Sequence, residues 1–273
     1  MSDEDRLRAY VDTWAAAVQD VVALLRSLTD EDWSRQTDCP GWDVRAVAAH
    51  LAHLESELAG NPQEDVEVPT LAHVVSPMGA YTEGGPVARR GWDAEEVVDE
   101  LETSAATRLA ALRAEPPTDG AVPAPVTPGN IGWTWETLLS NRALDVWMHE
   151  QDVRRAVGRP GGLDSAAARH TVGVFARGFA YVVGKRVAPP AGTSVLLEVT
   201  GAQPVHAAVG VGEDGRATRL REDPAAPTVT LRMDTETYVV LSGGRRTPAD
   251  VRVDVAGDAE LGGRVLASMA VTP

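Results

Sequence analysis

The apolar positions in the first 160 residues recur with the period of an α-helix. They return every three or four residues in four stretches, and a polar or glycine-rich connection follows each one. The stretches are 4–28, 43–59, 93–114 and 134–157. Asp43 is a good N-cap for the second, and Gly60 follows its end. Four helices with long crossovers predict a four-helix bundle.

One connection is unusually long. Residues 61–91 separate the second and third predicted helices, and proline and glycine interrupt them repeatedly (NPQEDVEVPT, then SPMGAYTEGGP). A segment of this length without strong periodicity is often a binding or site-covering loop. We therefore predict a loop over a functional site.

After Gly162 the pattern changes to short β-type runs between helices. Helices are expected over 165–184, from Asp234 to the Gly243-Gly244 pair, and over 259–269, and strands over 194–201, 206–212, 228–234 and 251–258. Strands and helices mixed in this way predict a small α+β domain. We expect two domains, residues 1–160 and 161–273.

Charge and aromatic content support this division. Residues 1–160 carry 28 acidic and 13 basic side chains, whereas the remainder carries 12 of each, and all seven tryptophans precede residue 150. The net charge of −15 therefore belongs to the first part of the chain. Nucleic acids and anionic membranes need a basic face, so we expect neither as a partner.

No targeting signal is expected. The N-terminus, MSDEDRLRAY, is acidic and polar, unlike a signal peptide, and apolar runs such as AYVVG are too short to span a bilayer. We expect a cytoplasmic protein. A single cysteine, Cys39, excludes an internal disulfide and a cysteine-rich zinc site. Its place in a turn before a helix favours a structural role over that of a nucleophile.

Three side chains form a candidate metal site. Asp145 and His149 are four residues apart on one predicted helix, and His50 lies on another. At about 100° per residue, each of the three falls at the edge of its helix's apolar stripe, whereas His53 points away, towards Glu57 and solvent. Three protein ligands leave a coordination position open, which is typical of catalytic zinc.

The same helix offers two supporting side chains. Arg142 lies on the side of Asp145, and Asp152, one turn beyond His149, is placed to act as an outer partner of that histidine. Other interpretations stay open. Asp145 can pair with Arg142 or His149 without any chemistry, and His50 taken alone is better explained as a satisfied core histidine than as a ligand.

Three longer motifs carry a family resemblance. They are CPGWDVRAVAAHLAHLE, NRALDVWMHEQDVRRAVGRPG and GGRRTPADVRVDVAGDAELGGRVLASMAV. Together they resemble the mycothiol-dependent maleylpyruvate isomerase family, an actinobacterial branch of the DinB/YfiT-like metal-binding superfamily. A basic content of 24 arginines and one lysine is typical of a GC-rich genome and fits such a source.

The resemblance implies a zinc-binding four-helix bundle followed by a small α/β domain like that of sterol carrier proteins. By motif position the metal ligands are His50, Asp145 and His149. The family has glutamate where this chain has Asp145, which shortens the reach of the carboxylate by one methylene group, although aspartate is a competent zinc ligand.

The resemblance also implies a chemistry. Zinc at this site would lower the pKa of the mycothiol thiol, and the thiolate would add to an electron-poor double bond in an isomerase or displace a leaving group in an S-transferase. Two other functions stay open, a hydrolase in which the metal activates water and a non-catalytic protein that binds a small ligand.

Further residues have candidate roles around the site. Arg245 and Arg246, in a glycine-rich turn, are candidates to bind a carboxylate of the substrate or thiol, although such pairs are more often solvated. His73 and Tyr81 of segment 61–91 are candidates to approach the metal. Four tryptophans are candidates for the mouth of the site, and core packing is the better interpretation for most; they are Trp42, Trp133, Trp135 and Trp147.

Overall fold

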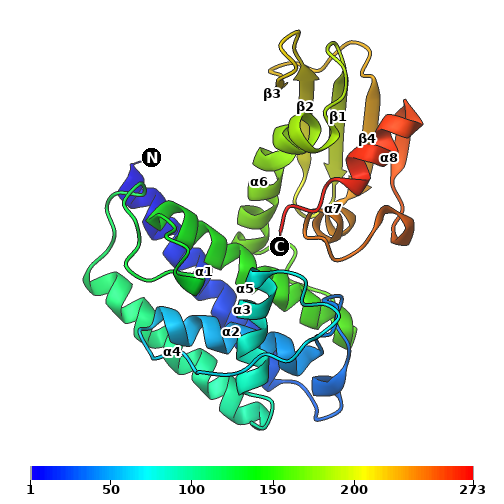
Figure 1. The fold of residues 1–273 in the computed structure, drawn as a ribbon. Coiled ribbons are helices and arrows are strands. Elements are labelled where there is room, and N and C mark those ends of the chain that lie inside the picture. Colours follow the sequence, from blue (N-terminus) through cyan, green and yellow to red (C-terminus); the bar gives the residue numbers. More distant parts are fainter. Residues whose placement is uncertain (1, 273) are drawn as a thin grey trace. The chain divides into compact units, whose positions relative to one another are not determined.

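Four long helices make up the first part of the protein. The computed structural model describes residues 2–272, and the chain forms two compact units that divide between Gly162 and Leu163. The long helices of the first unit are α1 (Asp3–Arg26), α2 (Val44–Leu58), α4 (Ala94–Ala114) and α5 (Trp135–Val157) (Figure 1). Helices α1 and α2 each pack against both α4 and α5. The predicted four-helix bundle is confirmed.

Side-chain caps set the starts of the helices that carry the candidate ligands. Asp43, the predicted N-cap of α2, accepts a hydrogen bond from the Ala46 backbone N–H at 2.8 Å. Thr134 caps α5 in the same way through the Thr137 N–H, and Gly158 ends α5 with a φ of +67°. These contacts satisfy backbone groups that a helix end leaves unpaired.

The bundle core contains a buried cluster of charges. Glu55 of α2 is fully buried and accepts hydrogen bonds from Arg142 of α5 at 2.7 and 3.1 Å, from Arg108 of α4 at 3.0 Å and from the Trp14 indole of α1 at 2.9 Å. The Arg108 guanidinium also lies over the Trp14 ring, 4.6 Å from its centroid. One carboxylate therefore joins all four helices.

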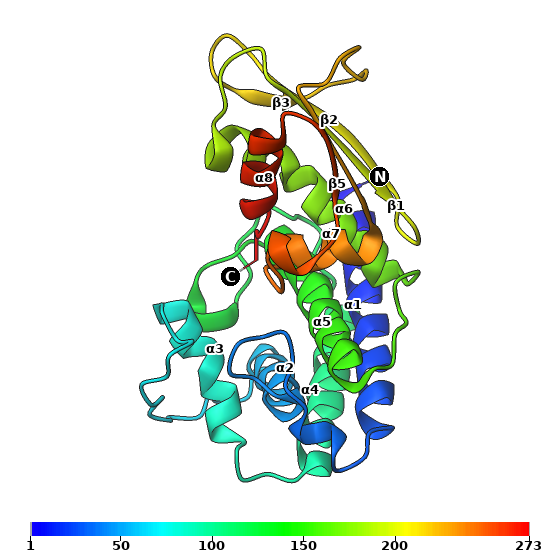
Figure 2. The same cartoon turned by 90° about the vertical axis from the view of Figure 1, so that its right-hand side faces the viewer.

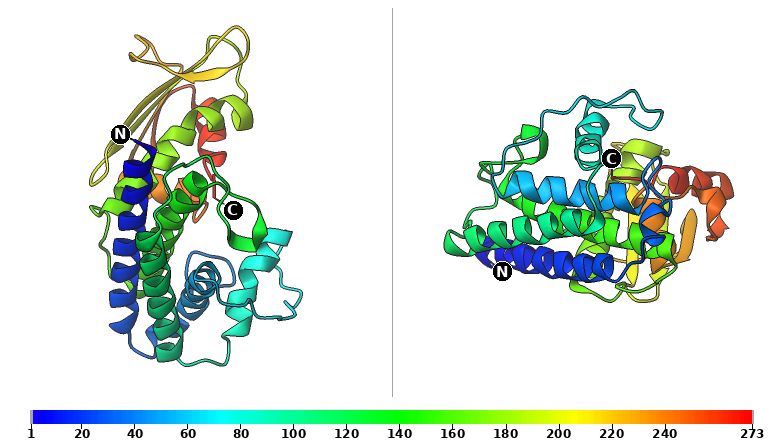
Figure 3. Two further views of the ribbon diagram at one scale, coloured as in Figure 1. Left: turned by 90° about the vertical axis from the view of Figure 1, so that its left-hand side faces the viewer. Right: turned by 90° about the horizontal axis from the view of Figure 1, so that it is seen from below.

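Segment 61–91 is not a plain loop, and in this respect the prediction was wrong. Residues Pro77–Ala88 form a helix, α3, that packs against α2 outside the four-helix bundle (Figure 3). Ser76 caps it and Pro77 stands in its first turn, where proline is tolerated. Gly85 is needed for packing, because an added Cβ would lie 2.6 Å from the Cβ of His53. Because α3 contains several glycines and two prolines, its sequence does not resemble that of a helix.

The same helix corrects the prediction for His53. This side chain is only 5% exposed, and its Nδ1 lies 3.0 Å from Glu64 Oε2. The prediction assumed that α2 has one buried face. Helix α3 covers a second face, and every residue from Val47 to Glu57 is buried.

The second unit contains a five-stranded sheet with the strand order β3-β2-β1-β4-β5. The β1–β4 pair is parallel and the other neighbours are antiparallel. The elements are α6 (Ala166–Tyr181), β1 (Ser194–Thr200), β2 (Val205–Val211), β3 (Ala217–Arg219), β4 (Val229–Asp234), α7 (Thr235–Ser242), β5 (Asp254–Gly257) and α8 (Ala259–Ala267). The predicted α+β fold is confirmed, although β3 was missed and β5 is shorter than expected.

Helices α6 and α8 cover one face of this sheet (Figure 2). Helix α8 approaches so closely at Gly262 that an added Cβ would lie 2.5 Å from Val255 and 3.2 Å from Val229. A π-helical turn, Val182–Val187, extends α6. Among residues 2–272, no helix has the length and apolar character that crossing a membrane requires.

The buried cluster yields a stability prediction. Glu55→Gln leaves two buried guanidiniums without a counter-charge, so we expect a loss of about 3–5 kcal/mol in the free energy of unfolding, measured by urea denaturation. Arg26→Ala, which breaks only exposed pairs with Asp99 and Glu102, should cost about 0–1 kcal/mol. Equal losses in the two variants would contradict the role assigned to Glu55.

The pH dependence of that contribution has a definite sign. Burial opposes ionisation of Glu55, but Arg142 and Arg108 together hold its pKa below the ordinary 4.5. The stabilisation is therefore complete above about pH 4.5 and is lost only as the pH falls through the lowered pKa of the folded state.

Candidate metal centre

Helices α2 and α5 bring the three predicted ligands together. The candidate donor atoms of His50, Asp145 and His149 all lie within 4.8 Å of one another. Nε2 of His50 is 3.7 Å from Asp145 Oδ2, and Nε2 of His149 is 3.7 Å from Asp145 Oδ1. Both imidazoles therefore direct the same nitrogen towards one carboxylate, and they do so from different helices.

These separations fit a divalent metal. Zinc binds imidazole nitrogen and carboxylate oxygen at about 2.0–2.2 Å, so the ligand atoms of a tetrahedral site lie about 3.3–3.6 Å apart. The observed 3.7 Å is too long for a hydrogen bond and close to that spacing. Two nitrogens and an oxygen are also a donor set that zinc accepts.

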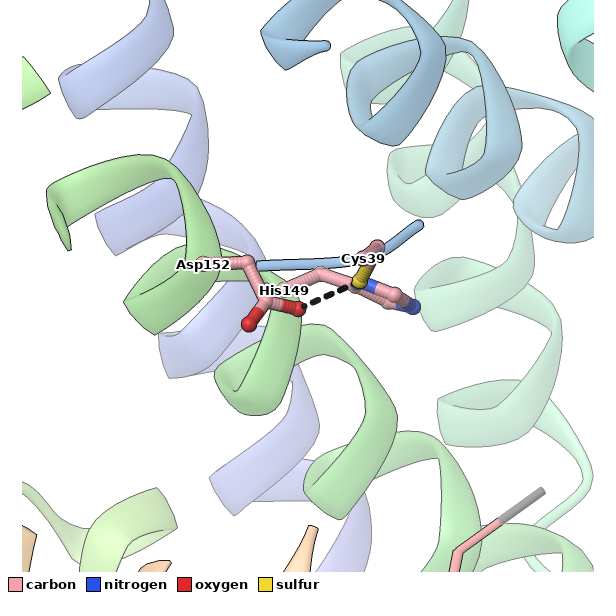
Figure 4. A group of neighbouring side chains, drawn as sticks. All are labelled: Cys39, His149 and Asp152. Carbon is pink, nitrogen blue, oxygen red and sulfur yellow. Dashed lines mark hydrogen bonds and ion pairs between the residues drawn. The ribbon is translucent and has the colours of Figure 1, made fainter. Parts of the chain in front are cut away.

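The imidazole of His149 is fixed from its other side. Its Nδ1 lies 3.1 Å from Asp152 Oδ2, and the Cys39 thiol donates to the same oxygen at 3.2 Å (Figure 4). Arg155 donates to the other oxygen of Asp152 at 2.5 Å. Asp152 is fully buried, so this carboxylate sets the tautomer and orientation of His149, as outer-shell carboxylates do for metal-binding histidines.

Cys39, His149 and Asp152 also form a second group whose potential ligand atoms lie within 4.8 Å of one another. However, both carboxylate oxygens of Asp152 are already bonded, Oδ1 to Arg155 and Oδ2 to the Cys39 thiol and His149 Nδ1. The arrangement is that of a hydrogen-bond network behind His149. Cys39 is buried in it, as a structural cysteine would be.

Arg142 connects the candidate ligands to the core. Its Nη1 donates to Asp145 Oδ2 at 2.7 Å, while its Nε and Nη2 donate to Glu55. Asp145 is therefore held from behind through Oδ2, while its Oδ1 lies 3.7 Å from Nε2 of His149. A short carboxylate with so defined a position loses little conformational freedom when it binds a cation.

The electrostatics of the two histidines differ. Burial lowers the pKa of His50 to about 4. Burial acts in the same direction on His149, but the Asp145 carboxylate and the hydrogen bond to Asp152 raise its pKa to about 10. Burial would also raise the pKa of Asp145, yet Arg142 and His149 hold it well below its ordinary value. A metal ion would take the place of the proton on His149.

Not every sequence candidate lies in this cluster. Trp42 does, with its ring centroid 4.9 Å from that of His50, whereas Trp147 is fully buried and bonds the Gly162 carbonyl. His73 belongs to neither potential metal group among the described residues; its Nε2 bonds Glu83 at 2.9 Å, and the Tyr81 hydroxyl bonds Glu57. Trp133 and Trp135 are half-buried.

Arg245 and Arg246 belong to the second unit. The Arg245 guanidinium donates to the Gly243 carbonyl at 2.8 Å, and the backbone N–H of each arginine bonds the Val240 carbonyl. Arg246 is exposed. These bonds fix the turn, and the role of the pair in binding a carboxylate stays a prediction.

Two important residues were missed in the sequence. Glu55 stands beside the inward positions of α2, but a glutamate on a helix is normally read as exposed. Glu83 lies in the segment expected to be a loop. Glu55 is spaced from His50, Leu51 and Leu54 as residues on one helix face are, which is a weak indication that it is buried. Nothing in the sequence indicates that Glu83 is buried.

Comparison with known proteins gives the family. Residues 14–154 match the mycothiol maleylpyruvate isomerase N-terminal domain, and residues 169–264 match the MDMPI C-terminal domain of the same family. The first match alone covers more than half of the chain. The chain therefore belongs to the mycothiol maleylpyruvate isomerase family, and the predicted membership of that enzyme family is confirmed. No curated protein matches the chain in sequence.

Two solved structures share the fold. The crystal structure of the mycothiol-dependent maleylpyruvate isomerase is 16% identical in sequence with a TM-score of 0.57. A histidine-to-alanine mutant of the mycothiol-dependent maleylpyruvate isomerase is 17% identical with a TM-score of 0.55. Each comparison covers 94% of this chain and 95% of the other. At this level of identity the likeness shows a shared fold.

The geometry predicts which histidines hold metal. His50→Ala and His149→Ala should each raise the Kd for Zn²⁺ by more than about a hundredfold, which exceeds the 10–100-fold typical of outer-shell changes. Competition with a chromophoric chelator measures this. His206→Ala is the control, because His206 is exposed on β2 and bonds Asp223. Unchanged affinity in the first two variants would refute the ligand set.

Proposed function

We propose that this protein is a zinc-dependent, mycothiol-using isomerase or S-transferase that acts on a small electrophilic substrate. The observation that carries the proposal is the donor set of His50, Asp145 and His149, which lie within 4.8 Å on two helices of a bundle whose family is named for mycothiol and maleylpyruvate. Zinc, when bound, would lower the pKa of a coordinating thiol, so that the thiol would be deprotonated near neutral pH.

The charges around the donors favour an anionic partner at this site. The charges of Glu55, Arg108, Arg142 and Asp145 cancel, and Arg155 pairs with both Asp152 and Asp38, which leaves one net negative charge among these groups. A divalent cation added to these surroundings still leaves an excess of positive charge. An anionic thiolate compensates it, and so does a carboxylate of the substrate.

The chain's own residues would keep the site in one geometry. Arg142 holds Asp145 through Oδ2, and Asp152 holds His149 through Nδ1. Trp42 packs against both imidazoles, with ring centroids 4.9 and 5.9 Å away, and keeps water from their faces. Orientation of the ligands before the substrate arrives lowers the entropic cost of reaching the transition state.

The first unit would thus be the metal-binding domain. Arg245 and Arg246 are our candidates for binding a carboxylate of the thiol or the substrate, since guanidiniums bind carboxylates in a bidentate fashion. A cytoplasmic setting agrees with this proposal, because low-molecular-weight thiols are kept reduced there.

Thiol dependence tests the proposal most clearly. With maleylpyruvate as substrate, the zinc-loaded protein should accelerate cis–trans isomerisation only when mycothiol is present, and His149→Ala should reduce the rate by at least about a hundredfold because a ligand is lost. His206→Ala should keep the full rate. Absorbance of the substrate measures the reaction.

The outcomes separate the rival functions. Turnover of an ester or amide by the metal-loaded protein without any thiol would contradict the proposal in favour of a hydrolase. Stoichiometric zinc with mycothiol-dependent conjugation of an alkyl halide, but no isomerisation, would select the S-transferase. A protein that binds no stoichiometric zinc would refute both forms.

A further inference from the structure

Segment 61–91 is linked to the candidate metal centre through Trp42, which lies in the turn before α2. The Trp42 ring is 8% exposed and lies beside both histidine ligands, tilted by 42° to His50 and by 37° to His149. An indole in contact with both imidazoles restricts their rotation. Its position therefore bears on the geometry of both nitrogen donors.

The position of Trp42 is set by Glu83. The indole N–H donates to Glu83 Oε2 at 2.7 Å, and Nε2 of His73 lies 2.9 Å from the same oxygen. Glu83 is on α3 and is only 5% exposed. A buried carboxylate that loses a hydrogen-bond donor is costly to leave unpaired. The bond from Trp42 to Glu83 therefore contributes more stabilisation than a hydrogen bond on the surface.

The backbone around Trp42 fits the same arrangement. The Trp42 carbonyl accepts hydrogen bonds from the backbone N–H of Thr37 at 3.1 Å and from its hydroxyl at 2.7 Å. Gly41 has a φ of +78°, and a Cβ there would lie 2.3 Å from Nδ1 of His73. The His73 ring thus lies directly against the turn that carries Trp42, where only glycine leaves room.

We propose that Glu83 couples segment 61–91 to the metal centre through Trp42, which acts as a positioning residue for His50 and His149. The inference rests on the metal centre of the proposed function. Coupling of this kind is reciprocal. If the order of the segment strengthens metal binding, then bound metal must also protect the segment from local opening.

The test uses Co²⁺, whose visible absorption reports both affinity and ligand geometry, on the full chain. Trp42→Phe keeps an aromatic ring but removes the donor to Glu83. Glu83→Ala removes the acceptor, and Glu83→Gln keeps one. Glu64→Ala is the matched control, because Glu64 is in the same segment and also bonds a histidine, His53, but not Trp42.

We expect Trp42→Phe and Glu83→Ala each to raise the Kd for Co²⁺ by about tenfold and to alter its visible spectrum. The double variant should be no weaker than either single variant, because both remove the same link. Glu83→Gln should recover most of the affinity. Glu64→Ala should lower the melting temperature without changing the Kd or the spectrum.

Hydrogen–deuterium exchange tests the reciprocal effect. Metal should slow exchange in peptides from 61–91 of the wild type at least several-fold, and in Trp42→Phe it should not. A Trp42→Phe variant with the Co²⁺ affinity and spectrum of the wild type would overturn the coupling while leaving the metal centre intact. If Glu83→Ala does not fold, Trp42→Phe alone tests the coupling. A wild-type chain that binds no Co²⁺ would overturn the metal centre itself.

Discussion

The salt bridges of Arg142 to Glu55 and Asp145 are the interactions on which the rest of the first unit depends. Glu55 is fully buried, so it requires positive partners, and Arg142 and Arg108 provide them from two other helices. Burial of these charges costs more than burial of apolar side chains of the same size. What it provides is a unique alignment of α2, α4 and α5, because each charge has its partners in only one arrangement of the helices.

Arg142 also links the buried core to the candidate metal centre. Because Arg142 bonds Glu55 and Asp145 at once, the carboxylate that faces the two histidines has a position fixed by the bundle core. His149 is fixed by Asp152, and Trp42 packs on both imidazoles. Asp145 and His149 are thus each held by a hydrogen bond, whereas His50 is held by packing against Trp42. Asp145 has a short side chain, and the arginine behind it gives its carboxylate a defined reach.

Helix periodicity and capping signals predicted the bundle, and the same periodicity selected His50, Asp145 and His149 as inward-facing. The predictions from periodicity were wrong where tertiary contacts override local helix preference. Helix α3 has a glycine at position 85 because the backbone there lies against His53, and local helix propensity does not include that contact. His53 and Glu55 were misjudged or missed because a polar residue on a helix is buried only when partners arrive from elsewhere in the chain, here Glu64, Arg108 and Arg142.

The proposed function requires that His50, Asp145 and His149 bind zinc and leave a coordination position for a thiol. X-ray absorption at the zinc edge of the loaded protein, with and without mycothiol, tests it most directly. We expect nitrogen and oxygen neighbours at about 2.0–2.2 Å in the zinc-loaded protein without thiol, and one added sulfur neighbour at about 2.3 Å with mycothiol. A zinc environment that is unchanged by mycothiol, or one that already contains sulfur from Cys39, would contradict it.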